Sequence, residues 1–135
     1  MKKVSLEEIK KFWIEAGKKD FDEQGLKPTA RDPYLQMLNE FYILKSLEPN
    51  SSVIDIGCGD GTSSLKFAKR VKNLTGIDYS ETLIERANEK CAPNTQFIFG
   101  DVLDIKSLFP LEYFDAIIII RCLINLPDEK MQYQA

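Results

Sequence analysis

The sequence predicts an α/β fold in which a parallel sheet carries helices on both faces, preceded by helices at the N-terminus. From residue 52 onward, short apolar strand patterns alternate with helical patterns, and this alternation is typical of parallel sheets. The last strand pattern, Ala116-Ile117-Ile118-Ile119-Ile120, is apolar at every position, as expected of a strand covered on both faces. The length of 135 residues is enough for one domain with a core.

The composition excludes several classes of function. The chain has no histidine, which removes Ser-His-Asp and Cys-His nucleophile systems, imidazole bases and zinc sites built on imidazole. A net charge of -3 gives no basic face for nucleic acid, so we predict no nucleic-acid partner. The 3 cysteines are far apart and form no CxxC pair, which fits a reduced compartment, and no metal site is indicated.

The sequence favours a cytoplasmic protein with no membrane partner. Residues 1–8 turn acidic before any apolar stretch, unlike a signal peptide. The longest apolar run, residues 116–120, is far too short to span a bilayer. We therefore expect a soluble, untargeted chain.

Residues 1–48 are predicted to form a helical cap segment. Apolar positions recur at helical spacing over residues 5–17, and Ser5 followed by Glu8 has the pattern of a capping box. Residues 18–33 are charged and interrupted by glycine and proline, which favours a loop. A second helix is predicted from Pro33 or Tyr34 to residue 47, with proline at a first helical position. The side chains expected to be buried on this helix are Leu35, Leu38, either Phe41 or Tyr42, and Leu47.

Residues 49–135 carry the alternating strands and helices. Strands are predicted at 52–56, 74–77, 95–99 and 114–120. Helices are predicted at 62–71 and 81–91, with a short helical turn at 104–108 and a further helix from Pro127 onward. A helix between each pair of strands is the usual crossover of a parallel sheet.

A glycine-rich turn follows the first predicted strand and leads into a helix. The segment Asp55-Ile56-Gly57-Cys58-Gly59-Asp60-Gly61 contains alternating glycines, and a turn alone rarely requires so many. Glycine lets the backbone turn sharply and lets a ligand approach without a Cβ in the way. We therefore interpret this turn as a ligand-binding loop rather than a purely structural one.

Acidic residues follow or end the first three predicted strands. Asp55 lies within an apolar strand and needs a cationic or hydrogen-bonding partner, although a helix or turn cap stays open as its role. Asp78 lies about twenty residues beyond the glycine turn, the spacing at which nucleoside-binding folds hold ribose hydroxyls. Its alternative is a cap for the next helix, a role for which Ser80 is better placed. In a parallel sheet, Asp55, Asp78 and Asp101 would all lie at one carboxyl edge.

The chain from residue 52 to about residue 128 resembles the class I S-adenosylmethionine-dependent methyltransferases. Their signature is an acidic residue followed by alternating glycines after the first strand, and the segment from Asp55 to Gly61 matches it without a gap. The resemblance implies a Rossmann-like sheet with the strand order 3-2-1-4 in this chain. It also implies S-adenosylmethionine as the cofactor and methyl transfer as the reaction, while the catalytic residues stay unknown.

The resemblance further implies which residues hold the cofactor. Gly57 and Gly59, with Cys58 between them, would lie against its methionine part, and Asp55 would bind its ammonium group directly or through water. Asp78 would hold the ribose hydroxyls. The remaining implied contacts are Tyr79 against the adenine, Asp101 for the adenine amino group, the Val102 backbone at the ring, and the Arg121 backbone carbonyl for the ammonium group.

Residues of the N-terminal segment have two interpretations each. Arg31 would lie over the cofactor carboxylate, where related enzymes often bring a basic residue, and a solvated surface arginine is the alternative. Trp13 and Tyr34 suggest a lid, but aromatic residues at helical spacing favour the core. These assignments depend on how the N-terminal helices lie over the sheet.

The sequence shows no activated thiol. Cys58 lies in the glycine turn, Cys122 follows the last strand, and Cys91 falls on the helical face of Leu83 and Ala87. Because no basic partner is visible for any of them, packing is favoured over a nucleophilic role.

The resembled family has a seven-stranded sheet in the order 3-2-1-4-5-7-6, of which this chain supplies the first four strands. The chain therefore looks truncated after the fourth strand, before the half that forms much of the acceptor pocket in that fold. The strand at 116–120 would then be an exposed apolar edge. We expect that the chain is a fragment or that this edge associates with another copy of the chain.

Three functions follow from these patterns. The leading one is methyl transfer to a small-molecule acceptor, because the N-terminal helices are expected to narrow the entrance and the net charge is acidic. The alternative is a non-catalytic module that binds S-adenosylmethionine or a nucleoside. An NAD(P)-binding oxidoreductase domain is less favoured, because the nicotinamide fingerprint requires glycine where this chain has Thr62.

Overall fold

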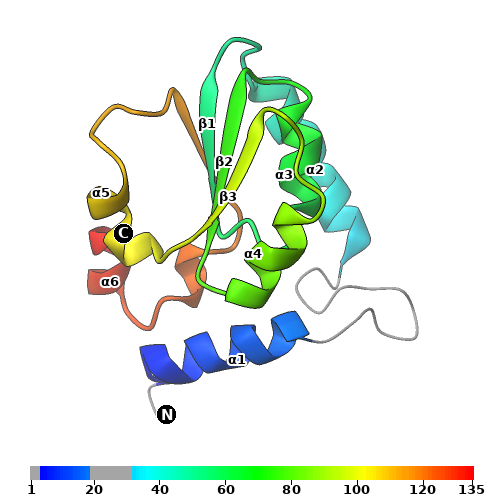
Figure 1. Cartoon of the computed structure of the whole chain (residues 1–135). Helices are drawn as coiled ribbons and strands as arrows, with labels where there is room; N and C mark the ends of the chain where they lie inside the picture. The colour runs from blue at the N-terminus through cyan, green and yellow to red at the C-terminus, as the bar shows by residue number, and fades with distance from the viewer. Residues whose placement is uncertain (1–3, 19–31) are drawn as a thin grey trace.

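The structure is a computed structural model in which residues 4–18 and 32–135 are described. Its centre is a parallel sheet of four strands in the order β3-β2-β1-β4 (Figure 1). The strands are β1 (Ser52–Ile56), β2 (Asn73–Asp78), β3 (Thr95–Phe99) and β4 (Ala116–Ile119). The predicted strand order and parallel direction are therefore confirmed, and the bounds predicted for β1 and β3 agree with the structure residue for residue.

Helices lie on both faces of the sheet, and α1 lies across one end of it (Figure 1). The α-helices are α1 (Leu6–Lys18), α2 (Pro33–Ser46), α3 (Thr62–Ala68), α4 (Glu81–Asn88), α5 (Ile105–Leu108) and α6 (Glu129–Gln134). Short 3-10 helices lie at η1 (Val102–Asp104) and η2 (Leu123–Asn125). Helices α3 and α4 end about three residues earlier than predicted, because the chain tightens there into turns that bond three residues back, such as Arg70 N–H to Phe67 O.

Two apolar cores lie on the two faces of the sheet. On one face Phe67 of α3 is fully buried among Val53, Leu74 and Phe97. Burying a side chain of this size contributes about 2 to 3 kcal/mol before entropic costs. A second buried cluster comprises Ile54, Ile56, Ile77 and Val102, against which parts of the segment after β4 pack. Both faces of the central strands are therefore covered, as predicted for a parallel sheet.

Helix α1 begins with the predicted capping box. The Ser5 hydroxyl accepts from the Glu8 backbone N–H at 3.2 Å, and the Glu8 carboxylate accepts from the Ser5 N–H at 2.8 Å. At its other end, α1 lies close to α4, because a Cβ on Gly17 would stand 2.9 Å from the Leu83 Cγ and 3.1 Å from the Ser80 Oγ. Glycine at this position therefore lets the two helices approach.

The apolar face predicted for α2 is wrong. Leu35 and Leu38 are exposed, as are Phe41 and Tyr42 at 59% and 60%, whereas Leu47 is buried as predicted. The face that meets α3 carries Glu40 instead, which binds side chains of α3 and orients the helix. Near the C-terminal end, Ile43 and Leu44 pack against the core, so the exposed apolar residues lie on the opposite side of α2.

Strand β4 lies at the edge of the sheet, as the sequence predicts. Ile118 is buried, but Ile117 is 63% exposed and Ile119 is 40% exposed. Their neighbours in the register are Ile54 and Ile56 of β1, so they share that face of the sheet. An edge strand with exposed isoleucines is a surface on which further chain can pair.

The position of Cys91 differs from the predicted one. Cys91 is exposed and lies beyond the end of α4, so its predicted place on the buried face of that helix is wrong. The early end of α4 is the physical reason, since the helical spacing no longer applies there.

Within residues 4–18 and 32–135, no helix is both long and apolar enough to cross a membrane.

Candidate functional site

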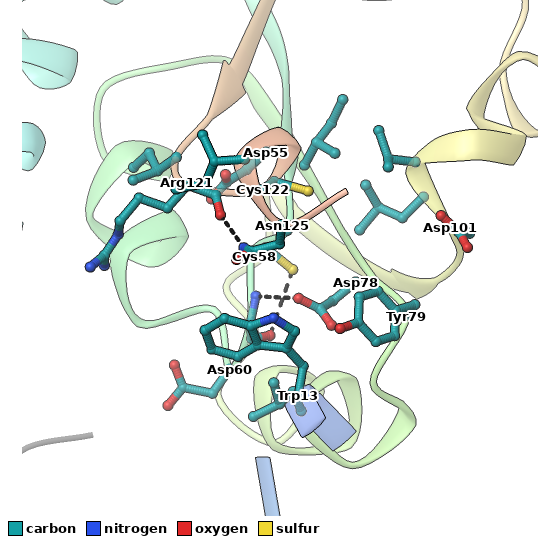
Figure 2. Close-up of a pocket in the computed structure, with 18 of the residues that line it drawn as sticks. Trp13, Asp55, Cys58, Asp60, Asp78, Tyr79, Asp101, Arg121, Cys122 and Asn125 are labelled. Atoms are coloured by element: carbon teal, nitrogen blue, oxygen red, sulfur yellow. Dashed lines mark hydrogen bonds between the residues drawn. The ribbon is translucent and has the colours of Figure 1, made fainter. Parts of the chain in front are cut away.

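A cavity of about 410 Å³ opens at the carboxyl end of the sheet (Figure 2). Its floor comes from the end of β1 and the glycine turn, and its sides come from the ends of β2 and β3 and the segment after β4. Side chains of α1 and α2 complete the lining. A cleft of this size, at the carboxyl end of a parallel sheet, is where open α/β folds bind small ligands.

The glycine turn needs glycine for two different reasons. Gly57, Gly59 and Gly61 all have positive φ, at 77°, 57° and 73°. A Cβ on Gly61 would lie 2.8 Å from the Phe97 ring, so this glycine serves the core. A Cβ on Gly59 would meet nothing within 4 Å, so this glycine leaves open space at the cavity lining. The turn therefore exposes its backbone to a ligand at Gly59.

Asp55 lies buried at the floor of the cavity, with 4% of its surface exposed. Its carboxylate accepts a hydrogen bond of 2.6 Å from the Ser64 hydroxyl of α3, which is the hydrogen-bonding partner that the sequence requires. Burial raises the pKa of Asp55 from 3.8 to about 6, partly offset by the Ser64 hydrogen bond. The site therefore contains a carboxylate that a cationic ligand would help to keep ionised.

Asp78 connects the end of β2 to the glycine turn. Its carboxylate accepts from the Gly59 backbone N–H at 3.0 Å and from the Ser80 backbone N–H at 2.9 Å. Ser80 is the N-cap residue of α4, as predicted, although its side chain makes no cap hydrogen bond. Burial raises the pKa of Asp78 despite these two donors. Asp78 thus holds the turn and lines the cavity at once.

Tyr79 and Asp101 lie on the next part of the lining (Figure 2). The Tyr79 hydroxyl is buried and has no hydrogen-bond partner among the described residues, and burial raises its pKa. Asp101 accepts from the Leu103 N–H at 3.1 Å and forms an ion pair with Lys10 of α1. Val102 is buried at the start of η1 and lines the cavity beside Asp101.

Arg121 and the two cavity cysteines follow the ends of β4 and β1. Arg121 has a φ of 54°, unusual for a residue with a side chain, and its backbone oxygen accepts from the Asn125 side chain. Cys58 and Cys122 both line the cavity. Burial, together with the charges of Asp55 and Asp78, raises the pKa of Cys58, and burial with the Asp78 charge raises the pKa of Cys122 to about 11. Both thiols therefore stay protonated near pH 7 and are poor nucleophiles.

The structure brings together all of the predicted cofactor-binding residues that it describes. Asp55, Gly57, Cys58, Gly59, Asp78, Tyr79, Asp101, Val102 and Arg121 all line the cavity. Arg31 lies outside the described residues, so its predicted place over the cofactor stays a prediction. Tyr34 is 81% exposed, so its expected place in the core is wrong. The reason is again the orientation of α2.

Sequence reasoning missed the cavity residues of the N-terminal helices. Lys10 and Trp13 of α1, and Gln36 and Asn39 of α2, line the cavity, and Asn125 lines it after β4. For Trp13 the sequence favours the core over a lid, whereas the structure places it in the cavity lining. Helical spacing identifies the inner face of α1, but it does not show whether that face meets the core or a cavity.

Comparisons with known proteins agree with this arrangement. Residues 53–134, more than half of the chain, match the family described as methyltransferase domain. A trans-aconitate 2-methyltransferase of Deinococcus radiodurans is 33% identical over 70 residues, covering 50% of this chain and 27% of the relative. A 2-methyl-6-phytyl-1,4-hydroquinone methyltransferase of Synechocystis is 30% identical over 114 residues, covering 78% of this chain and 35% of the relative. The chain thus spans about a quarter to a third of the length of these relatives.

Solved structures show the same fold. The N-methyltransferase NodS of Bradyrhizobium japonicum, solved with S-adenosyl-L-homocysteine, superposes with a TM-score of 0.75 at 22% identity, covering 93% of this chain and 63% of that one. A phosphoethanolamine N-methyltransferase of Haemonchus contortus gives a TM-score of 0.70 at 24% identity, covering 91% of this chain and 28% of that one. Together with the match over residues 53–134 and the strand order, these findings show that the chain belongs to the class I S-adenosylmethionine-dependent methyltransferase family.

Proposed function

We propose that this chain binds S-adenosylmethionine and belongs to an enzyme that transfers the cofactor's methyl group to a small-molecule acceptor. The observation that carries the proposal is the open glycine turn at Gly59, flanked by the carboxylates of Asp55 and Asp78 in one cavity. Residues 49–135 are the proposed cofactor-binding unit, and residues 1–48 are its helical cap. Two cap helices supply cavity residues, which supports this division.

The residues of the cavity fit the proposed cofactor. The space at Gly59 admits a ligand against the backbone, and the buried carboxylate of Asp55 suits a cationic group such as an ammonium. Asp78 keeps acceptor capacity beyond its two backbone donors and is the proposed partner of the ribose hydroxyls. Tyr79 is proposed to lie against the adenine, where its unpartnered hydroxyl would also gain a neighbour.

Asp101, Val102 and Arg121 are the remaining proposed cofactor contacts. Asp101 and the Val102 backbone are proposed to meet the adenine, and Asp101 would then share its carboxylate between the ligand and Lys10. The backbone carbonyl of Arg121 is proposed to accept from the ammonium group. A carbonyl oxygen can accept twice, so the bond from Asn125 is compatible with a second one from the ammonium group.

The bound cofactor would supply an electrophilic methyl group on its sulfonium, so the protein mainly has to align an acceptor and exclude water. Helix α1 lies over the cavity with Trp13 on its inner side and would help to exclude water. The described cavity thiols stay protonated, and the chain contains no histidine. We therefore assign no base to the described residues.

A small-molecule acceptor is supported by the size of the cavity. Residues of α1, α2 and the segment after β4 line the cavity, and its volume of about 410 Å³ is suited to small ligands. The named relatives that methylate trans-aconitate or a phytyl hydroquinone act on small molecules. The acidic net charge also disfavours a nucleic-acid acceptor.

A non-catalytic module that binds S-adenosylmethionine is the second candidate. The observation that favours it is that we assign no base among the described cavity residues, whose thiols stay protonated. Both candidates require the same cofactor site, so they differ in turnover and not in binding. Methyl transfer to a panel of small acceptors, measured with labelled cofactor, would separate them.

Calorimetric titration tests the cofactor assignment itself. The chain is titrated with S-adenosylmethionine, S-adenosylhomocysteine and NAD, and folding is checked by far-UV circular dichroism. We expect saturable heats from the two adenosyl ligands and none from NAD. A folded protein that gives no heat with either adenosyl ligand would overturn the proposal.

A further inference from the structure

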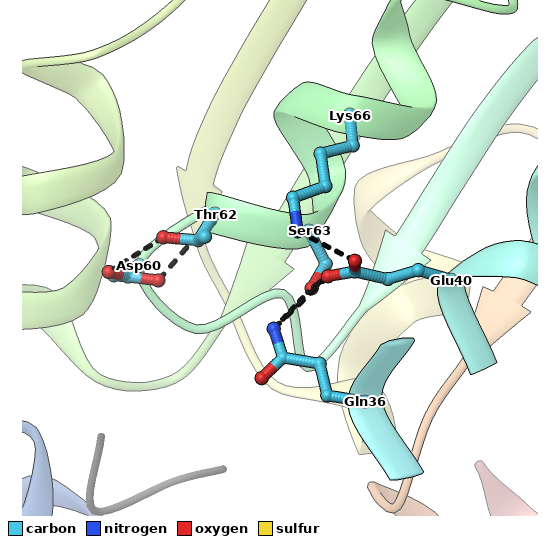
Figure 3. Close-up of polar contacts among 6 residues, drawn as sticks. All are labelled: Gln36, Glu40, Asp60, Thr62, Ser63 and Lys66. Carbon is cyan, nitrogen blue, oxygen red and sulfur yellow. Dashed lines mark hydrogen bonds and ion pairs between the residues drawn. The ribbon is translucent and has the colours of Figure 1, made fainter. Parts of the chain in front are cut away.

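A buried carboxylate ties helix α2 to helix α3 beside the cavity (Figure 3). Glu40 is 6% exposed, and its Oε1 accepts from the Ser63 hydroxyl at 2.8 Å. Its Oε2 accepts from the Lys66 ammonium at 2.6 Å. Burial alone would raise the pKa of Glu40, but hydrogen bonds from Lys66, Ser63 and Gln36 outweigh it and lower the pKa. The carboxylate is therefore ionised and holds α2 in place.

Glu40 and Ser63 also determine the orientation of the Gln36 carboxamide. The Gln36 Nε2 lies 3.1 Å from Glu40 Oε1 and 3.2 Å from Ser63 Oγ. A carboxylate only accepts, and the Ser63 hydroxyl hydrogen is already given to Glu40, so both contacts require the amide nitrogen of Gln36. If the amide were flipped, the Gln36 oxygen would face two acceptor oxygens, Glu40 Oε1 and Ser63 Oγ, with no hydrogen between them. The orientation of the carboxamide is thus fixed by its partners.

This arrangement leaves the Gln36 oxygen without a donor among the described residues. Gln36 lines the cavity, and Figure 3 shows its oxygen on the side of the carboxamide away from Glu40 and Ser63. Ser63 belongs to the first turn of α3, which follows the glycine turn directly. The oxygen is therefore a hydrogen-bond acceptor of fixed orientation on a residue that lines the cavity, and a ligand that meets it must carry a donor.

We propose that Gln36 is a cofactor-binding residue whose oxygen accepts from the ammonium group of the methionine part, with Glu40 as its positioning residue. The inference rests on the proposed function, which puts the methionine part at Gly57 and Gly59. An ammonium group has three N–H donors, and the proposed function gives it Asp55 and the Arg121 carbonyl as partners. Gln36, which lines the same cavity, supplies the third acceptor.

The test compares two ligands that differ in the amino-acid part. S-adenosylhomocysteine carries the ammonium group, whereas 5'-methylthioadenosine keeps the adenosyl thioether and lacks the amino acid. Trp13 is the single tryptophan and lines the cavity, so its fluorescence reports binding of either ligand. The variants are Gln36→Met, which keeps the length of the side chain, and Gln134→Met as a matched control outside the cavity lining.

We expect Gln36→Met to weaken S-adenosylhomocysteine by about tenfold or more and to leave methylthioadenosine within about twofold. Glu40→Ala should cause the same selective loss, and the double variant should bind no worse than either single variant, because both act through one contact. Melting temperatures confirm that the variants are folded. Equal losses for both ligands, or an unchanged affinity for S-adenosylhomocysteine, would overturn the inference. A wild-type chain that binds neither ligand would overturn the proposed function instead.

Discussion

The Ser64 hydroxyl donates a hydrogen bond of 2.6 Å to the carboxylate of Asp55, and both side chains are buried. The bond joins the middle of α3 to the end of β1, directly beneath the glycine turn. A buried carboxylate without a donor is costly, so this contact allows an acidic residue to lie in an apolar strand. It also fixes the carboxylate at the floor of the cavity.

Removing this donor is expected to destabilise the fold. Ser64→Ala should lower the free energy of unfolding at pH 7.5 by about 1 to 3 kcal/mol, because Asp55 then loses its hydroxyl donor. Urea unfolding followed by circular dichroism measures the effect. Ser46→Ala, which removes an exposed hydroxyl bonded to Tyr42 O, is the matched control and should cost less than about 0.5 kcal/mol. Equal effects of the two substitutions would contradict the prediction.

The raised pKa of Asp55 predicts a specific pH dependence of stability. The unfolded carboxyl titrates near 3.8 and the folded one near 6, so folding favours its protonated form. The contribution of Asp55 to the free energy of unfolding is therefore most favourable below about pH 3.8 and is lost as the pH rises through about 6. The difference between the two pKa values corresponds to an effect on the order of 3 kcal/mol.

The variant Asp55→Asn isolates this effect from the other carboxyls. Its stability relative to wild type should increase between pH 4.5 and pH 7 and then stay level. Urea unfolding of both proteins across this range gives the difference directly. A difference that does not change with pH would show that Asp55 has an ordinary pKa in the folded chain.

Asp78 is expected to contribute strongly to the binding of adenosyl ligands. Asp78→Ala should weaken S-adenosylhomocysteine by about 1.5 to 3 kcal/mol, because the ribose hydroxyls lose a charged acceptor. Calorimetric titration measures the loss. Asp104→Ala is the control, since that carboxylate is exposed and makes no cap hydrogen bond. A comparable affinity in both variants would remove Asp78 from the proposed site.

The exposed edge of β4 predicts association between copies of the chain. Ile117 is 63% exposed on an edge strand, where another strand can pair and cover it. Sedimentation velocity should show a mass that rises above 15.5 kDa with concentration. Ile117→Lys should return the protein to the monomer, as charged residues do on natural edges. A stable wild-type monomer at all concentrations would contradict this prediction.

The fold was largely predictable because strand patterns and glycine turns act locally. The run at 52–56 is apolar except for Ser52 and Asp55, and turn residues precede it, so its bounds follow from composition. Helix ends were less predictable, since α3 and α4 end where their last turns tighten. Those ends depend on contacts such as the Asn88 side chain with Phe97 O, which helical spacing does not contain.

The sheet-edge half of the site was predictable, and the half from the N-terminal helices was not. Asp55, Asp78 and Asp101 converge because parallel strands end at one edge. The inner face of α2 is set instead by Glu40, a polar residue that finds Ser63 and Lys66 across the fold. A pattern of apolar residues cannot predict a helix orientation that a buried carboxylate decides.

Gly61 and Gly59 are expected to contribute differently to stability and to ligand binding. Gly61→Ala should lower the free energy of unfolding by about 2 to 5 kcal/mol, because its Cβ would lie 2.8 Å from the Phe97 ring at a φ of 73°. Gly59→Ala should cost about 1 to 2 kcal/mol, because only its positive φ is strained.

For ligand binding the order should reverse. The methyl group of Gly59→Ala would occupy open space at the cavity lining and should weaken S-adenosylhomocysteine by about tenfold or more, since the ligand loses its approach to the backbone. Urea unfolding and calorimetric titration on the same two variants measure both effects. If Gly59→Ala binds the ligand as wild type does, the open backbone at Gly59 is not where the cofactor lies.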